Sequence, residues 1–194
     1  MPNLYIIAGC NGAGKTTASY TILPEILNCK EFVNADNIAA GISPLNPESV
    51  AIEAGRIMLN RVALLMDERA DFAFETTLAT RSYVSLTKKA QQMGYKITLL
   101  YFWLDSPETA FRRVAKRVSE GGHNIPIEVI ERRYYRGIWN LINLYTPVCD
   151  KWMVMNNVEV PSELVAHGGS ELANVIINND IWNVILAQSN DSEN

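Results

Sequence analysis

The feature that most constrains the fold is a glycine-rich stretch close to the N-terminus. It reads Gly9-Cys10-Asn11-Gly12-Ala13-Gly14-Lys15-Thr16 and fits the pattern G-x-x-x-x-G-K-[ST] without a gap. A fully apolar run at residues 4–8 precedes it, which is typical of a buried parallel strand, and a helix is expected over residues 14–27. Glycines let successive backbone N–H groups turn inward around phosphate oxygens, and the helix N-terminus adds a favourable dipole. The stretch therefore predicts a phosphate-binding loop, called the P-loop below (residues 9–16).

The chemistry of this loop indicates a nucleoside triphosphate with a metal ion. Lys15 is expected to bridge the β- and γ-phosphates, and the Thr16 hydroxyl to ligate Mg²⁺. A dinucleotide-binding fold also has a glycine-rich first turn and an acidic residue about 20 positions later, where Asp36 stands, but the order G-x-G-x-x-G is absent. ATP and Mg²⁺ are thus the predicted cofactors. The predicted nucleotide-binding residues are Gly9, Asn11, Gly12, Ala13, Gly14, Lys15, Thr16 and Thr17.

The rest of the chain alternates between expected strands and expected helices. Further strands are expected at residues 32–35, 71–76, 96–104 and 152–155, and helices at 47–69, 81–93, 106–119 and 126–144. A weaker strand and helix follow at residues 175–177 and 181–187. This alternation predicts an α/β fold with a parallel sheet covered by helices on both faces. We expect one domain over residues 1–188 and a frayed tail at residues 189–194.

Composition narrows the classes of function. Hydrophobic residues make up 48% of the 194 residues and charged residues 20%, as in ordinary globular proteins. The net charge of −4 argues against a nucleic-acid partner. Neither a signal peptide nor an apolar run long enough to span a bilayer is recognisable, so no membrane association is expected.

Three cysteines, Cys10, Cys29 and Cys149, share no metal-ligand spacing. They indicate free thiols in a reducing cytoplasm, which is the expected location of the protein. Cys10 lies inside the P-loop, where a lowered thiol pKa is conceivable, although a merely tolerated variable position is the favoured interpretation.

Two carboxylates follow expected strands at the edge where ligands of such sheets bind. Asp36 comes after the second strand, where a carboxylate can accept the proton of an attacking hydroxyl; the alternative is a cap of the helix that follows. Glu75 ends the third strand, where it could hold Mg²⁺ through water or grip substrate hydroxyls; the alternative is a cap of the next turn.

An arginine-rich stretch at about residues 112–136 predicts a lid. Two arginine-bearing helices are joined by Gly121-Gly122, and such lids exclude water and supply cations to developing charge. We predict Arg117 and Arg133 as catalytic, and Arg113 and Arg136 as substrate-binding, the alternative being a solvated face. The basic residues of the stretch are Arg112, Arg113, Lys116, Arg117, Arg132, Arg133 and Arg136.

The ordered set of motifs resembles the zeta-toxin-like P-loop kinases over about residues 5–157. The segments that carry the resemblance are GCNGAGKTT, FVNADNIA, FAFETTLAT, LDSPETAFRRVAKRVSEGGHNIP and ERRYYR. The resemblance implies an ATP- and Mg²⁺-dependent kinase whose five-stranded sheet has the order 2-3-1-4-5. It also implies UDP-N-acetylglucosamine as acceptor and an antitoxin protein as partner. The toxins carry an arginine shortly after the catalytic aspartate, whereas here Asn-Ile-Ala-Ala-Gly follows.

Residue by residue, the resemblance implies that Lys15 and Thr16 bind the phosphates and the metal. Asp36 becomes the catalytic base, and Glu75 and Thr76 contact the substrate. We add Arg81 to the predicted substrate-binding residues.

The sequence therefore predicts a phosphotransferase that moves the γ-phosphate of ATP to a hydroxyl of a small molecule. Two alternatives stay open. One is a P-loop ATPase or nucleotide switch without transfer, suggested by the lack of a clear strand-ending metal aspartate. The other is a polynucleotide 5′-hydroxyl kinase, in which the lid arginines contact strand phosphates.

Overall fold

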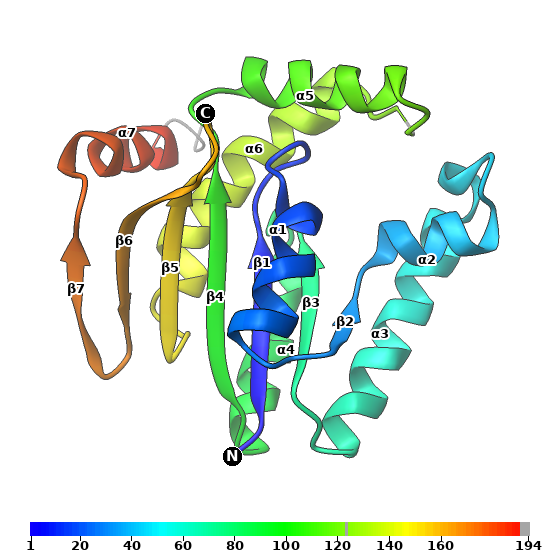
Figure 1. Ribbon diagram of the computed structural model, residues 1–194. Helices are drawn as coiled ribbons and strands as arrows, with labels where there is room; N and C mark the ends of the chain where they lie inside the picture. The colour runs from blue at the N-terminus through cyan, green and yellow to red at the C-terminus, as the bar shows by residue number, and fades with distance from the viewer. Residues whose placement is uncertain (123, 191–194) are drawn as a thin grey trace.

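A computed structural model describes residues 1–122 and 124–190, and within them one mixed sheet runs through the molecule (Figure 1). Its order is β2-β3-β1-β4-β5-β6-β7. The strands are β1 (Asn3–Ala8), β2 (Glu31–Val33), β3 (Phe72–Thr76), β4 (Lys96–Trp103), β5 (Lys151–Asn156), β6 (Glu163–Gly169) and β7 (Leu172–Ile176). The first five strands are parallel in the order 2-3-1-4-5, which confirms the α/β fold and the predicted order.

The sheet has seven strands in the described part of the chain, so the prediction of five was wrong. β6 and β7 are antiparallel to their neighbours and extend the sheet beyond β5. β6 was missed because it ends in Gly168 and Gly169, which have low strand propensity. Their missing side chains let the strand approach β5 closely: a Cβ on Gly168 would lie 2.8 Å from the Trp152 ring.

Helices lie on both faces of the sheet; in Figure 1, α1 lies in front of β1 and α4 behind it. The α-helices are α1 (Lys15–Thr21), α2 (Ala35–Ile42), α3 (Ala51–Asp67), α4 (Ser82–Gln92), α5 (Pro107–Ser119), α6 (Ile127–Asn140) and α7 (Asn179–Asn190). Three short turns extend them: η1 (Ile22–Ile26) and η3 (Leu141–Tyr145), both π-helical, and the 3₁₀ turn η2 (Pro47–Val50). Pro24 lies in η1, where its missing N–H cannot continue an α-helical ladder. None of the described helices is long and apolar enough to cross a bilayer.

The C-terminal helix extends further than expected. α7 reaches Asn190, so residues 189 and 190 are helical rather than frayed, and residues 191–194 lie outside the described residues. Ser189 is buried, and Gln188 accepts a 3.0 Å hydrogen bond from the Trp103 indole. These contacts hold the end of α7 against the sheet.

The core is built on the central strands β1 and β4, whose apolar side chains are buried on both sides of the sheet. Parallel strands covered on both faces have such continuous apolar sequences. The register places Ala8 beside Thr76 of β3 and Tyr101 of β4. β1 thus ends level with β3, while β4 continues to Trp103, at the point where the strand order reverses and ligands of such sheets bind.

Candidate active site

The P-loop leaves the end of β1 and is fixed by contacts with two other segments. Gly12 and Gly14 have φ angles of +79° and +82°, which favour glycine. A Cβ on Gly12 would lie 2.9 Å from the Ala110 carbonyl oxygen of α5, and one on Gly14 would lie 2.5 Å from the Asn157 side-chain nitrogen. Both glycines are therefore required by the backbone angle and by space.

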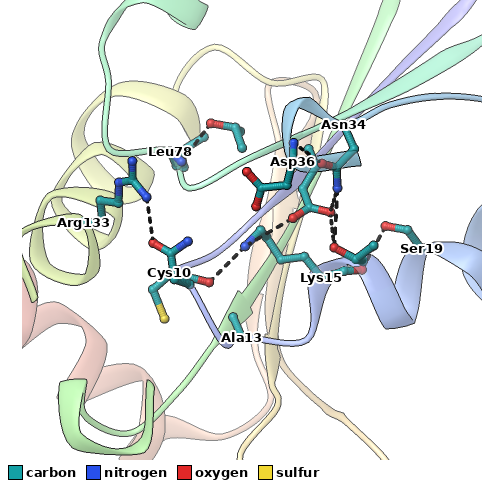
Figure 2. A network of polar contacts seen from close by, with 12 residues as sticks. Cys10, Ala13, Lys15, Ser19, Asn34, Asp36, Leu78 and Arg133 are labelled. Carbon is teal, nitrogen blue, oxygen red and sulfur yellow. Dashed lines mark hydrogen bonds and ion pairs between the residues drawn. The ribbon is translucent and has the colours of Figure 1, made fainter. Parts of the chain in front are cut away.

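Lys15 opens α1 with its ammonium group curled back over the loop (Figure 2). The residue is only 6% exposed; Nζ donates to the Cys10 carbonyl at 2.9 Å and lies 3.5 Å from a Glu75 oxygen. The first N–H groups of α1 have no partner within the helix, and the helix dipole adds positive potential there. A buried cation over a ring of N–H donors fits the phosphates of ATP.

Thr16, Glu75 and Asn34 form a connected cluster beside Lys15. Glu75 Oε2 accepts from the Thr16 hydroxyl at 2.7 Å and from the Asn34 amide at 2.8 Å. A hydroxyl oxygen next to a carboxylate suits the oxygen ligands that Mg²⁺ prefers, so these residues fit the metal of a bound Mg·ATP. The turn after β3 is capped by Thr76 and not by Glu75, because the Thr76 hydroxyl accepts from the Leu78 N–H at 3.0 Å.

Asn34 is a site residue that the sequence analysis missed. It is the N-cap of α2, and its side-chain oxygen accepts from the N–H groups of Asp36 at 2.8 Å and Asn37 at 3.1 Å. Asn34 thus takes the capping role that was the alternative for Asp36. The segment Phe-Val-Asn-Ala-Asp carried the signal, because asparagine is a strong N-cap residue before a helix.

Asp36 lies in the first turn of α2 with an exposed side chain. Figure 2 shows its carboxylate directed into the space between Lys15 and Arg133. Arg133 on α6 donates to the Asn11 side-chain oxygen at 3.1 Å, so it is tied to the P-loop. Burial lowers the pKa of the Arg133 guanidinium, and the nearby Asp36 carboxylate opposes that shift. The structure brings together Asp36, Lys15 and Arg133, three of the four predicted catalytic residues.

Two cavities flank Asp36. The polar cavity, of about 200 Å³, is lined by Lys15 and Arg133 and by Asn34, Glu75, Thr76, Thr77, Thr80 and Tyr83. The apolar cavity, of about 210 Å³, lies between α2, η2 and the start of α3 on one side and residues 124–129 on the other. Its apolar lining is Ala35, Ala39, Pro47, Ala51, Ile125, Pro126 and Val129. Both cavities share Ala35, Asp36 and Arg133.

The other predicted arginines occupy different places. Arg113 on α5 faces the P-loop: it donates to the Val158 carbonyl at 2.7 Å and lies 3.5 Å from the Gly12 carbonyl. Arg117, one turn further, packs against Gly122. Arg136 is exposed on α6, and the exposed Arg81 lies 5.0 Å from the Trp139 ring centroid. None of these four is among the described residues that line the two cavities.

The helices of the predicted lid lie above the carboxyl ends of the strands (Figure 1). α5 begins as predicted, with the Ser106 hydroxyl accepting from the Thr109 N–H and Pro107 in the first turn. α5 and α6 pack on each other, and residue 123 between them lies outside the described residues. Arg113 and Arg133 thus connect both helices to the P-loop.

Asn157, which follows β5, is a second residue that the sequence analysis missed. Its amide donates to the Ala13 carbonyl at 2.6 Å, and its side-chain oxygen accepts from the Ser162 hydroxyl. The asparagine lies at the end of an expected strand, but nothing in its sequence neighbourhood points to the P-loop 144 residues away. Asn157 buttresses the loop from the side opposite Asp36.

The Cys10 thiol is 2% exposed, and burial raises its pKa to about 11, while nearby Lys15 acts in the opposite direction. Burial thus acts against a lowered pKa at this position.

Known proteins with similar sequences point to the same kind of P-loop protein. The model of the zeta toxin family matches residues 1–146. An uncharacterized protein of Haemophilus influenzae is 29% identical over 126 residues, covering 65% of this chain and 88% of that protein.

Two solved structures show the same fold. A chain of the AvrRxo1-ORF1:AvrRxo1-ORF2 complex with sulphate ions has a TM-score of 0.77 at 16% identity over 95% of this chain. This chain spans 63% of its length. A chain of the PezAT chromosomal toxin–antitoxin system of Streptococcus pneumoniae has a TM-score of 0.69 at 15% identity, covering 100% of this chain and 88% of that one. With the family model matching most of its length, and the P-loop, Asp36 and the arginine-bearing helices in one site, this chain belongs to the zeta toxin family.

Proposed function

We propose that the protein is a kinase that transfers the γ-phosphate of Mg·ATP to a hydroxyl of a small molecule. The observation that carries the proposal is the position of Asp36, whose carboxylate is directed into the space between Lys15 and Arg133 at the edge of the polar cavity. A hydroxyl in that cavity meets a carboxylate on one side and two phosphate-binding cations on the other. This arrangement suits in-line phosphoryl transfer, in which positioning and charge stabilisation do most of the work.

Each residue has a distinct role in this proposal. Bound Mg·ATP supplies the phosphoryl group, and its metal offsets negative charge on the phosphates. Asp36 accepts the proton of the acceptor hydroxyl as the hydroxyl oxygen attacks the γ-phosphorus; the bond from that phosphorus to the β–γ bridging oxygen breaks, and ADP leaves. Lys15 and Arg133 stabilise the charge that develops on the transferred group. Thr16 would ligate the metal and Glu75 would hold it through water.

The nucleotide-binding and substrate-binding sets follow from these positions. Residues 9 and 11–17 bind the nucleotide phosphates, and Glu75 and Thr76 border the acceptor. We propose Arg117 as a further catalytic cation and Arg81, Arg113 and Arg136 as substrate-binding residues. Because none of these four described residues lines the cavities, these roles require movement of α5 and α6 or a large acceptor.

The zeta toxin family makes UDP-N-acetylglucosamine the first acceptor to test. We expect mass spectrometry of a mixture of protein, Mg·ATP and this sugar nucleotide to reveal a product heavier by one phosphate. Lys15→Ala should abolish it by removing ATP binding. Asp36→Asn should retain ATP binding but lower transfer by about 10²–10⁴-fold, the usual range for a general base. Near-wild-type transfer by Asp36→Asn would contradict the assigned base.

The same assay, repeated without an acceptor and with an oligonucleotide as acceptor, separates the alternatives. Slow ATP consumption that no acceptor changes would indicate a nucleotide switch or ATPase without transfer. Transfer to the 5′-hydroxyl of an oligonucleotide, weakening steeply with salt, would indicate a polynucleotide kinase.

We also propose a protein partner that acts as an antitoxin. The PezAT chain comes from a toxin–antitoxin system, and the AvrRxo1 chain comes from a two-protein complex. Growth arrest on expression of the wild type, but not of Asp36→Asn, would support a toxic role that such a partner restrains. We further propose a cytoplasmic location for the protein described by this sequence. The three buried free thiols of this chain suit a reducing cytoplasm.

A further inference from the structure

The proposed chemistry uses the polar cavity and leaves the apolar cavity on the other side of Asp36 without a role. The two adjoin at Asp36, because Ala35, Asp36 and Arg133 line both. Each alone is smaller than the roughly 300 Å³ at which ordinary small-molecule pockets begin, and the two together reach that range. An acceptor that brings a hydroxyl to Asp36 can therefore extend into the apolar cavity.

The lining of the apolar cavity selects an apolar group. Ala39 and Ile125 are buried, and Pro47 and Val129 are partly buried around the same space. Polar groups here are few: apart from Asp36 and Arg133, the described lining adds the carboxylate of Glu48 and the amide of Asn124. Such a surface gains free energy when a hydrocarbon replaces water and offers little to an anion.

The charges around Asp36 also disfavour an anionic acceptor. Among the described residues that line the two cavities, the cations are Lys15 and Arg133, and the acidic residues are Asp36, Glu48 and Glu75. Lys15 pairs with Glu75, and both cations face the P-loop, where they are assigned to the nucleotide. No cation of this lining is left to neutralise a phosphate or diphosphate on the acceptor.

We propose that the acceptor is a neutral, hydroxyl-bearing molecule with a compact apolar substituent that occupies the apolar cavity. The inference rests on the proposed kinase activity and narrows its acceptor: it favours a neutral glycoside over a sugar nucleotide. The acceptor hydroxyl lies at Asp36, and the substituent lies between α2 and the residues that lead into α6. Substituent length, rather than charge, then determines how well an acceptor binds.

A series of acceptors with one sugar and different aglycones tests this inference. We take N-acetylglucosamine glycosides with methyl, propyl, butyl and hexyl chains, together with UDP-N-acetylglucosamine, and measure phosphate transfer from Mg·ATP. KM should fall about fourfold for each added methylene until the cavity is filled, as expected for burial of one CH₂ group. The butyl glycoside should show a higher kcat/KM than the UDP sugar.

Two pairs of variants test whether the substituent of the acceptor binds in the apolar cavity. Ala51→Phe places a ring in the apolar cavity from the exposed start of α3, and it should remove the dependence of KM on chain length. Ala63→Phe puts the same ring on the exposed side of the same helix, away from the cavity lining, and should retain the dependence. Ala39→Phe and Ala40→Phe repeat the comparison on α2. ATP binding by each variant, measured separately, establishes that the P-loop is intact.

The outcomes separate this inference from the function on which it rests. Transfer to the UDP sugar in clear preference to the glycosides would overturn the neutral-acceptor inference and leave the kinase standing. A KM independent of chain length, or equal chain-length dependence in Ala51→Phe and Ala63→Phe, would also overturn it. No transfer to any member of the series would contradict the inference, and continued absence of product with other hydroxyl compounds would contradict the kinase itself.

Discussion

At the scale of single residues, the site depends on a few side chains that each make two kinds of contact. Asn34 caps α2 through its oxygen and holds Glu75 through its nitrogen. Asn157 joins the P-loop to the segment after β5, and Arg133 joins α6 to the loop. Motif reading found Lys15 and Asp36 because their spacing is local. It missed Asn157 and the contact of Asn34 with Glu75 because both depend on strands that only the folded sheet brings together, whereas the N-cap signal of Asn34 is local.

Asn34 allows its two roles to be separated. Asn34→Ser keeps a good N-cap but is too short to reach Glu75, whereas Asn34→Ala removes both contacts. We expect Asn34→Ala to lower the free energy of unfolding by about 1 kcal/mol more than Asn34→Ser, as for other lost caps. Both should weaken the Mg²⁺ dependence of ATP binding equally, because Glu75 loses the hydrogen bond from Asn34 in both. Urea unfolding and ATP titration at several Mg²⁺ concentrations provide the two measurements; equal unfolding free energies would refute the capping role.

At the scale of elements, local sequence signals predicted most of the fold. The apolar runs gave the five parallel strands, and Ser106-Pro107 gave the start of α5. Asn46-Pro47 predicted that an α-helix starts at residue 47. A 3₁₀ turn begins there instead, and the α-helix α3 starts only at Ala51. β6 stayed hidden because it owes its place to pairing with β5, whereas the end of the largely exposed β7 was predicted as the weak strand at residues 175–177. Pairing between distant segments is what single-sequence patterns do not encode.

The position of α5 relative to the P-loop depends on one arginine of an adjacent pair. Arg113 reaches Gly12 and Val158, whereas its neighbour Arg112 is exposed and donates to Thr109 in its own helix. Arg113→Lys loses the forked geometry and should weaken ATP binding about tenfold, within the usual strength of charge-assisted hydrogen bonds. Arg112→Lys is the matched control and should bind ATP like the wild type. Isothermal titration with both variants decides the matter, and equal affinities would show that α5 is held by other contacts.

At the scale of the whole molecule, the fold places two arms around one edge of the sheet. α2 and α3 form one arm and α5 and α6 the other, and Asp36 and Arg133 lie where the two arms face each other. The P-loop occupies the end of β1 between them. The sequence could predict this edge as the site, because the strand order reverses there. It could not predict the apolar cavity, because its lining comes from segments more than 70 residues apart, such as Ala51 and Ile125.

The three cysteines buried in the core make the free energy of unfolding sensitive to alkaline pH. Cys10, Cys29 and Cys149 are all buried, and burial raises their thiol pKa values from about 9 to about 11 for Cys10 and Cys29 and about 12 for Cys149. Above about pH 9 the unfolded chain loses these protons while the native state keeps them, so the unfolded state binds fewer protons and the free energy of unfolding must fall as pH rises. Below pH 9 both states are protonated, and the thiols add no pH dependence.

Cys149, which is fully buried, provides the test of this sensitivity. Between about pH 9 and 11 it should contribute a decline of roughly 1.4 kcal/mol per pH unit to the free energy of unfolding. Cys149→Ala removes the titrating group, so its stability should decline less steeply by that amount, although its stability at pH 7 is lower because the side chain shrinks. Urea denaturation of both proteins at intervals from pH 7 to 10.5 measures the two slopes under reducing conditions. Parallel curves above pH 9 would mean that the thiol ionises in the native state, and hence that water reaches the space between η3 and β5 where Cys149 lies.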